Sequence, residues 1–254
     1  MTEDLFSLQN RVAVVTGGEG QLGREIVRGL EARGARVAVF DLQADRFRVD
    51  VKDRAAIEAA VEAVTREWEV PHVLVNAAAL DSPPDAPAEE VGPVESYPET
   101  SFDQVMDVNV KGTFQCCQVI GARMAAAGRG SIVNISTIYG MLSPVQDLYE
   151  FRRREGDEFY KPIAYSVSKS ALYNLTRYLA TYWAKSGVRV NTLTLAGVAN
   201  EQPREFVEAY TARMPVGRMA DVREVVGPVV FLASDASSYV TGANLVVDGG
   251  WSAW

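Results

Sequence analysis

The sequence predicts an α/β fold, in which a parallel sheet carries helices on both of its faces. Short apolar, β-branched runs alternate with segments of helical periodicity from one end of the 254 residues to the other. A glycine-rich turn separates the first of these runs from the first helical segment. No linker or internal repeat interrupts the alternation. We therefore predict a single doubly wound domain over residues 1–254, built on a seven-stranded parallel sheet.

The first expected strand, at residues 12–15, is a continuous apolar run, as a strand buried between two helix layers is. The other strands are expected at residues 36–40, 47–51, 73–79, 131–135, 188–193 and 245–250. The expected helices have apolar residues three or four apart, as at Ile57, Val61 and Val64. Later helices are expected at 102–124, 165–186, 205–214 and 224–232. Two long segments, 80–100 and 140–164, show neither pattern, and in a compact domain such segments are usually lids, binding loops or flexible chain.

Composition argues against several classes of protein. Apolar residues make up 48% and charged residues 23%, as in an ordinary globular protein, and the net charge of −8 argues against nucleic acid as a partner. The only cysteines, Cys116 and Cys117, are adjacent and cannot sensibly bridge each other, and no Cys/His cluster suggests a metal site. The acidic start does not resemble a signal peptide, and no apolar run reaches the length of a membrane span. We expect a protein of the reducing cytoplasm, without a metal or a membrane partner.

The turn from Thr16 to Gly23 predicts a phosphate site. Its glycines permit a tight turn and a close approach of the backbone to a ligand. The helix that follows begins with unpaired N–H groups and the positive end of its dipole, which favour a pyrophosphate. Because a strand precedes the turn and a helix follows it, the context is that of a dinucleotide site.

Asp41 indicates which dinucleotide is preferred. It ends the second expected strand, a little over twenty residues after the glycines, where a carboxylate can accept both hydroxyls of the adenosine ribose. The same carboxylate would repel a 2′-phosphate, and Glu19 adds a second negative charge in the turn. Arg46 and Arg48 are contrary evidence, several residues further along. The balance predicts NAD rather than NADP.

Tyr165 and Lys169 form the second constellation. They are four residues apart in a helical run, so their side chains face one site. A phenol has an unperturbed pKa of about 10. A neighbouring ammonium favours the phenolate, so Lys169 is expected to lower the pKa of Tyr165 and fit it for proton exchange with a carbonyl or alcohol oxygen.

Other polar residues are placed to join this site. Ser136 and Thr137 follow the expected strand at 131–135, where their hydroxyls can donate to a substrate oxygen or cap the next turn. Asn109 lies among apolar neighbours in a helix and should have a hydrogen-bonding partner. His72, at the entry to a strand, is expected to be structural because ligands bind at the carboxyl ends of such strands.

Taken in order, the motifs of this chain resemble those of the short-chain dehydrogenase/reductase family over essentially its whole length, which implies a Rossmann-type domain. They are TGxxxxxG at 16–23, Asp50-Val51, Asn76-Ala77-Ala78, Asn109, Asn134-Ile135-Ser136-Thr137, Tyr165-x-x-x-Lys169, Arg189-Val190-Asn191 and Val247-Asp248-Gly249-Gly250. The cofactor contacts that the resemblance implies are Thr16, Gly17, Gln21, Leu22, Gly23, Asp41, Asp50, Val51, Asn76, Ala77, Ala78, Tyr165, Lys169 and Val198.

The resemblance also implies catalytic roles. Tyr165 would be the general acid and base, and Lys169 would lower its pKa and hold the nicotinamide ribose. Asn109 would anchor a water in a proton relay. The hydroxyl at the family's serine position, here Thr137, would orient the carbonyl, with Ser136 as the alternative. The nicotinamide would give or take a hydride.

Four positions depart from the family pattern. Gln21 stands where the family has a glycine, so its side chain must point away from the pyrophosphate or reach the cofactor, while its N–H can still serve. Ala79 and Ala196 replace a glycine and a proline. Thr137 replaces the serine but carries the same donor and acceptor. We therefore expect catalytic activity to be retained.

The segment 140–164 is interpreted as an insertion at the substrate mouth. Thr137 and Tyr165 are 28 positions apart, more than in most members of the family. Arg152, Arg153 and Arg154 suit a carboxylate or phosphate, and a solvated charge run explains them equally well. With residues 200–203, the segment resembles members linked to bacterial nonulosonic-acid and surface-sugar pathways.

The leading hypothesis is an NAD(H)-dependent oxidoreductase that interconverts a secondary alcohol and a ketone on a small polar substrate, such as a sugar or sugar acid. A 3-ketoacyl-type reductase is an alternative, which the charged insertion disfavours. A catalytically silent dinucleotide-sensing module is another, which the intact Tyr165, Lys169 and Asn109 disfavour. The apolar faces of 102–124 and 165–186 and the C-terminal tryptophans predict a homo-oligomer, a tetramer with two-fold symmetry.

Overall fold

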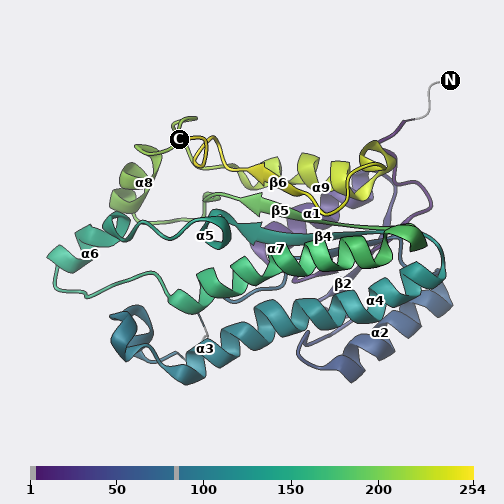
Figure 1. Cartoon of the computed structure of the whole chain (residues 1–254), viewed down its shortest axis with the longest axis horizontal. Coiled ribbons are helices and arrows are strands. Elements are labelled where there is room, and N and C mark those ends of the chain that lie inside the picture. Colours follow the sequence, from purple (N-terminus) through teal and green to yellow (C-terminus); the bar gives the residue numbers. More distant parts are fainter. Residues whose placement is uncertain (1–3, 83–85) are drawn as a thin grey trace.

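The computed structural model describes residues 4–82 and 86–254, and within these residues six strands form one parallel sheet (Figure 1). The strands are β1 (Val12–Thr16), β2 (Arg36–Phe40), β3 (Val73–Asn76), β4 (Gly130–Thr137), β5 (Val188–Leu195) and β6 (Asn244–Val247). Their order is β2-β1-β3-β4-β5-β6, and every neighbouring pair is parallel. The order reverses between β1 and β3, and ligands bind outside the carboxyl ends of strands at such a point.

The prediction of a seventh strand at 47–51 is wrong. One isolated bridge, between Asp41 and Arg48, joins this segment to the end of β2, and the amide of Val49 donates to the carbonyl of Asp41 at 3.0 Å. The side chains of Phe47, Val49 and Val51 are buried in the same core cluster as helix α2 (Arg54–Glu67). The run is therefore apolar because its side chains pack, although its backbone does not form a ladder.

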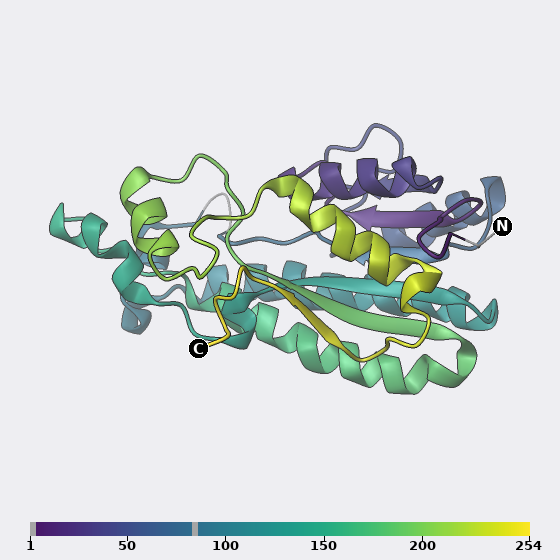
Figure 2. The same ribbon diagram turned by 90° about the horizontal axis from the view of Figure 1, so that it is seen from above.

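Helices cover both faces of the sheet (Figures 1 and 2). One face packs against α2, α4 (Thr113–Ala126) and α7 (Ile163–Trp183), in a core that includes Phe40, Leu74 and Ile120. The other face packs against α1 (Gln21–Ala32) and α9 (Val226–Ala233), in a core that includes Val15 and Leu193. The strands are thus buried on both sides, which confirms the doubly wound arrangement.

The helix expected over 102–124 is divided. It consists of α3 (Glu99–Met106), a π-helical turn (Asp107–Gly112) and α4. A Cβ at Gly112 would lie 2.7 Å from the side chain of Val51, so this turn approaches its neighbours closely. Asn109 lies in the π-helical turn, a kind of irregularity that is frequent at functional sites.

A third packed cluster lies beyond the carboxyl ends of the strands. The segment 140–164, expected to be irregular, contains the end of α5 (Ile138–Met141), the short helix α6 (Glu150–Arg154) and the first residues of α7. Together with α8 (Arg204–Thr211) and the C-terminal turn, it buries Tyr139, Tyr149, Tyr210 and Trp251. Figure 2 shows α6 and α8 at the same end of the molecule. The insertion is therefore packed onto the fold at the end where ligands are expected.

No helix within the described residues is both long and apolar enough to cross a membrane. In the same residues, no group of three or more His, Cys, Asp or Glu side chains is placed to hold a metal ion. His72 is buried, and its Nδ1 accepts the N–H of Val12 at 3.1 Å, so its contacts here are structural.

Candidate active site

A cleft of about 680 Å³ opens at the carboxyl ends of the strands. Its catalytic candidates are Thr137 at the end of β4 and Tyr165 and Lys169 on α7. The predicted cofactor contacts Gln21, Leu22, Ala77 and Val198 line the same cleft. The fold therefore brings predicted catalytic residues and predicted cofactor contacts into one cavity.

Lys169 is buried, with 4% of the residue exposed, and its Nζ donates to the carbonyl of Ile135 at 3.0 Å. The Nζ lies 6.0 Å from the centroid of the Tyr165 ring. Burial lowers the pKa of Lys169 to about 8, against a smaller opposing effect of Asp81. The ammonium retains two further N–H groups that can face the cleft.

The pKa of Tyr165 is raised, not lowered as the sequence suggested. The main cause is burial of the phenol, followed by the negative charge of Asp81, while the hydroxyl of Thr137 acts in the opposite direction. Lys169 is not among the groups that shift this pKa, so in the free protein the direction of the shift is set by burial and by Asp81.

The two candidate hydroxyls at the end of β4 differ in their surroundings. Ser136 is buried and its Oγ donates to the carbonyl of Lys169 at 3.1 Å, which ties β4 to α7. Thr137 accepts the N–H of Tyr139 at 3.4 Å as the N-cap of α5, and its hydroxyl lies beside the phenol of Tyr165. The geometry favours Thr137 as the hydroxyl that meets a substrate oxygen.

Asn109 finds the partner that its buried position demands. Its Oδ1 accepts the N–H of Leu80 at 2.7 Å, and its Nδ2 donates to the carbonyl of Leu80 at 2.8 Å and to Ser168 Oγ at 2.9 Å. Its carbonyl accepts the hydroxyl of Thr113 at 2.8 Å. Asn109 thus joins the chain that leaves β3 to α7, next to Lys169.

The glycine-rich turn fits a pyrophosphate. Gly20 is the N-cap of α1 and no side chain caps this helix, so donors of the first turn face outward without a side-chain partner among the described residues. Gly17 has a φ of +67°, and a Cβ at Gly23 would lie 2.0 Å from the carbonyl oxygen of Gly17. The turn can therefore form only with glycine at these two positions.

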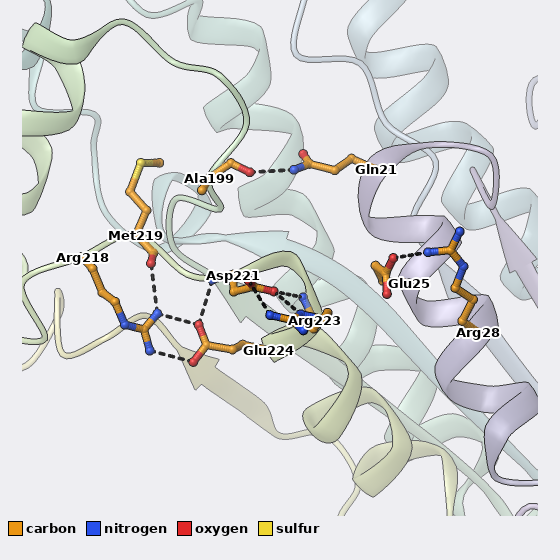
Figure 3. Close-up of polar contacts among 9 residues, drawn as sticks. All are labelled: Gln21, Glu25, Arg28, Ala199, Arg218, Met219, Asp221, Arg223 and Glu224. Carbon is orange, nitrogen blue, oxygen red and sulfur yellow. Dashed lines mark hydrogen bonds and ion pairs between the residues drawn. The ribbon is translucent and has the colours of Figure 1, made fainter.

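Gln21 points away from the turn. Its Nε2 donates to the carbonyl of Ala199 at 2.7 Å, a contact that links α1 to the chain after β5 (Figure 3). The same figure shows Arg218 paired with both carboxylate oxygens of Glu224, at 2.7 and 2.8 Å. This pair braces the segment in which Ala220 bridges Val198. Val198 is thereby held at the edge of the cleft.

Asp41 is oriented by the backbone. Its Oδ2 accepts the N–H of Glu19 at 3.1 Å and its Oδ1 accepts the N–H of Gln43 at 3.0 Å. The carboxylate therefore faces the glycine-rich turn with lone pairs to spare for two hydroxyls. Arg46, which argued for NADP, pairs with Glu67 and lies over the rings of Phe47 and Trp68, at 5.0 and 5.6 Å from their centroids.

The remaining cofactor candidates are buried or bonded to neighbours. The hydroxyl of Thr16 accepts the N–H groups of Ala77 and Ala78, both at 3.2 Å. Asn76 donates to Asn134 Oδ1 at 2.8 Å, while its own Oδ1 has no partner among the described residues. Asp50 accepts the N–H of Lys52 at 2.9 Å, and Val51 is in the core.

The three arginines of the insertion have three different environments. Arg152 lines the cleft, donates to Asp157 at 2.6 Å and lies 3.9 Å from the centroid of the Phe159 ring. Arg153 donates to two carbonyls within the insertion, at 2.9 and 3.0 Å, and is structural. Arg154 is exposed and pairs with Glu150. Of the three, only Arg152 lines the cleft.

Sequence reasoning missed two charged residues of the cleft, Asp81 and Lys161. They form an ion pair, and the Lys161 Nζ lies 5.1 Å from the centroid of the Tyr165 ring. The spacing of Lys161 and Tyr165, four residues, is a signal that could have indicated Lys161. No sequence signal links Asp81 to Lys161 or Tyr165, because Asp81 is 80 residues away from Lys161 in the chain.

Comparison with protein families gives a match to the model described as "Enoyl-(Acyl carrier protein) reductase" over residues 19–252. Among curated proteins, the chain is 34% identical to the D-threitol dehydrogenase of Mycolicibacterium smegmatis, over 97% of this chain and 95% of that protein. It is also 34% identical to the galactitol 2-dehydrogenase (L-tagatose-forming) of Cereibacter sphaeroides, over 98% of each.

Solved structures share the fold over the whole chain. A gluconate 5-dehydrogenase from Burkholderia cenocepacia, in complex with NADP and tartrate, superposes with a TM-score of 0.85 and 27% identity, covering 99% of this chain and 98% of that one. A short-chain dehydrogenase from Leptospira borgpetersenii with bound NAD⁺ has a TM-score of 0.84 and 29% identity, covering 99% and 96%. These two neighbours carry different dinucleotides, so likeness of fold leaves the choice of cofactor to the residues.

Proposed function

This chain belongs to the short-chain dehydrogenase/reductase family and acts on alcohol groups, and we propose that it interconverts a secondary alcohol and a ketone on a polyol or related sugar-like substrate with NAD(H). The observation that carries the proposal is the meeting of Thr137, Tyr165 and Lys169 in one cleft with the glycine-rich turn. Relatives named for threitol, galactitol and arabinitol support the substrate class.

In this mechanism, Tyr165 passes a proton to the carbonyl oxygen in reduction and takes one from the alcohol in oxidation. Thr137 donates to the same oxygen and fixes its position beside the phenol. Lys169, held by the carbonyl of Ile135, would hold the nicotinamide ribose with its other N–H groups. Asn109 would anchor the water that returns the proton; its Nδ2 donates to Ser168, which precedes Lys169 on α7, and its oxygens keep acceptor capacity for that water. Bound nicotinamide supplies or accepts the hydride.

Substitution of Tyr165 by phenylalanine tests the mechanism. The variant should fold and bind NADH while turnover falls by about 10²- to 10⁴-fold, the contribution typical of a general acid/base. Calorimetry measures NADH binding, and NADH absorbance measures turnover over a panel of polyols, sugars and sugar acids. Normal turnover by the variant would exclude Tyr165 from proton transfer.

The preference for NAD rests on Asp41, whose carboxylate two backbone amides aim at the turn. Two unit charges about 4 Å apart interact by roughly 4 kcal/mol at an effective dielectric near 20, an upper guide, so a fraction of that repels a 2′-phosphate. NADH should therefore bind at least about tenfold tighter than NADPH. Asp41→Ala should reduce this difference in affinity. Tighter binding of NADPH to the wild type would reverse the assignment.

The description of the matching family model favours one alternative, a reductase of acyl-carrier thioesters. Reduction of an enoyl or a 3-ketoacyl thioester faster than oxidation of any polyol would establish it. A dinucleotide-sensing module would bind NADH and turn over none of the panel. The narrower likeness to surface-sugar pathway members stays a prediction.

The insertion over 140–164, proposed as the substrate loop of a single domain, has two ends that lie at the cleft. Arg152 lines the cavity there, so Arg152→Ala should raise the KM for substrate. Arg154→Ala, which removes an exposed pair with Glu150, should leave kinetics unchanged. Steady-state kinetics with saturating NAD distinguish the two. Equal effects of both variants would place the substrate elsewhere.

A homotetramer remains part of the proposal. Tyr178 and Tyr182 on α7 are stacked 6.2 Å apart and are 64% and 67% exposed, and Phe114 on α4 is 42% exposed. Large exposed aromatic side chains on neighbouring helices favour an interface between copies. Light scattering at micromolar concentration should give the mass of four chains.

A cytoplasmic location likewise stays a prediction. The two cysteines, which are free and buried, are consistent with it.

A further inference from the structure

An ion pair beside Tyr165 has no role in the mechanism given above. Lys161 precedes α7 and Asp81 follows β3, and both line the cleft. The Lys161 Nζ is 5.1 Å from the centroid of the Tyr165 ring, closer than Lys169 at 6.0 Å. The side chain of Lys161 is 13% exposed and that of Asp81 is 55% exposed. A confined cation and an accessible carboxylate thus lie next to the reacting position.

Both partners keep hydrogen-bonding capacity. An ammonium has three donors, and within the described residues the Nζ of Lys161 bonds only to Asp81. A carboxylate has about four acceptor positions, and in the same residues Asp81 accepts only from Lys161. Of the other cations of the cleft, Arg152 is engaged by Asp157 and the face of Phe159, and Lys169 donates to the carbonyl of Ile135 and is assigned to the nicotinamide ribose. Lys161 and Asp81 are therefore the charged groups beside Tyr165 to which the mechanism gives no role.

We propose that Lys161 and Asp81 together bind a hydroxyl group on the carbon next to the reacting one, and that they select neutral vicinal polyols over substrates with an anion at that carbon. This inference rests on the function proposed above and narrows its substrate class.

A hydroxyl matches the pair because it is both donor and acceptor. It donates to the carboxylate of Asp81 and accepts from the ammonium of Lys161, without breaking their attraction. A substrate carboxylate has acceptors alone, so it competes with Asp81 for Lys161 and faces a like charge. A hydrogen-bonding site also rejects a molecule that lacks the hydroxyl, since the largely covered ammonium of Lys161 is then left with unused donors.

Two substitutions separate this role from a structural one. Asp81→Asn removes the negative charge, and Lys161→Met keeps the alkyl stem without the ammonium. If the pair merely joined two loops, both variants would lose every ligand alike. If the pair recognises the substrate, Asp81→Asn should weaken the binding of a neutral polyol and strengthen the binding of a carboxylate, because Lys161 is freed. Lys161→Met should weaken the binding of both.

Calorimetry on the enzyme–NADH complex measures these affinities without requiring turnover. The probes are the polyol of the panel that binds best and a 2,3-dihydroxy acid such as tartrate. Asp81→Asn should lower the affinity for the polyol about 10- to 100-fold, as expected for the loss of a bond to a charged group. The same variant should raise the affinity for the acid about tenfold. Lys161→Met should weaken both, and Lys161→Arg should restore much of the polyol affinity.

Lys111→Met is the matched control. Lys111 pairs with Asp107, with side chains 60% and 50% exposed, and does not line the cleft, so affinities should match the wild type. Polyol affinity within twofold of wild type in Asp81→Asn, or parallel losses of polyol and acid in that variant, would overturn the inference. Wild-type enzyme that turns over no alcohol with either dinucleotide would instead defeat the proposed function, and the binding data would still decide the role of the pair.

Discussion

Replacing Lys169 with methionine should remove a measurable dependence of stability on pH. Lys169 is 4% exposed, and burial lowers its pKa from 10.5 to about 8 in the folded protein. The negative charge of Asp81 raises this pKa and partly offsets the effect of burial, although Asp81 does not form a direct ion pair with Lys169. The folded chain therefore holds this proton less tightly than the unfolded chain does.

The sign follows from the two pKa values. Below pH 8 both states are protonated, and the folded state carries the full cost of the buried charge, about 3 kcal/mol for a difference of about 2.5 units. Between pH 8 and 10.5 the folded protein releases the proton while the unfolded chain keeps it, so stability rises with pH. From pH 7 to pH 9.5 the wild type should gain about 2 kcal/mol relative to Lys169→Met.

Guanidinium unfolding, followed by tryptophan fluorescence at fixed protein concentration, measures the free energy of unfolding at each pH. The variant also loses the bond to Ile135, but both the ammonium and the neutral amine can donate it, so its loss shifts the curve without tilting it. Burial raises the pKa of both thiols, that of Cys117 to about 12, so stability falls as pH rises above their ordinary values. That effect is common to both proteins and cancels in the difference. Parallel curves for wild type and variant would refute the buried charge.

Three further outcomes are expected. Thr137→Ser should retain turnover and Thr137→Val should lose most of it. Ser136→Ala should keep turnover but lower the free energy of unfolding by about 1 kcal/mol, because the bond from Ser136 to Lys169 joins β4 to α7. Tyr210→Phe should lower the thermal midpoint, because the backbone N–H of Gly197 then loses its acceptor. In alcohol oxidation, kcat/KM should rise steadily to pH 9.5, because the raised pKa of Tyr165 delays formation of the base, and a plateau below pH 8 would contradict that.

The fold was predictable where burial dictates sequence. Strands covered on both faces are rich in apolar residues, and six of the seven expected runs are strands. The run at 47–51 alternates apolar and charged residues, and its apolar side chains pack in the same core as α2 while its backbone pairs only once. An apolar pattern reports where side chains go, and only the three-dimensional arrangement shows whether a ladder partner is present.

The candidate site was predictable where its residues share a local element. Tyr165 and Lys169 share a helix, and Thr137 ends a strand that leads into the same cleft. The direction of the pKa shift at Tyr165 was not predictable, because the sequence reveals the nearby ammonium but not the loss of water around the phenol. Desolvation is a property of the assembled cavity, to which residues from the whole chain contribute.

The charge of the cleft shows the same limit more sharply. Three consecutive arginines suggest a site for an anion, yet the structure directs one into the cleft, one to backbone carbonyls and one to the surface. Two of the cations that line the cavity each meet an aspartate: Arg152 pairs with one from within the insertion, and Lys161 pairs with one 80 residues away. The third, Lys169, is held by the backbone carbonyl of Ile135. A ligand therefore encounters paired charges instead of the positive density counted along the sequence. Paired charges offer donors and acceptors side by side, which is the arrangement that a hydroxyl group can satisfy and a carboxylate cannot.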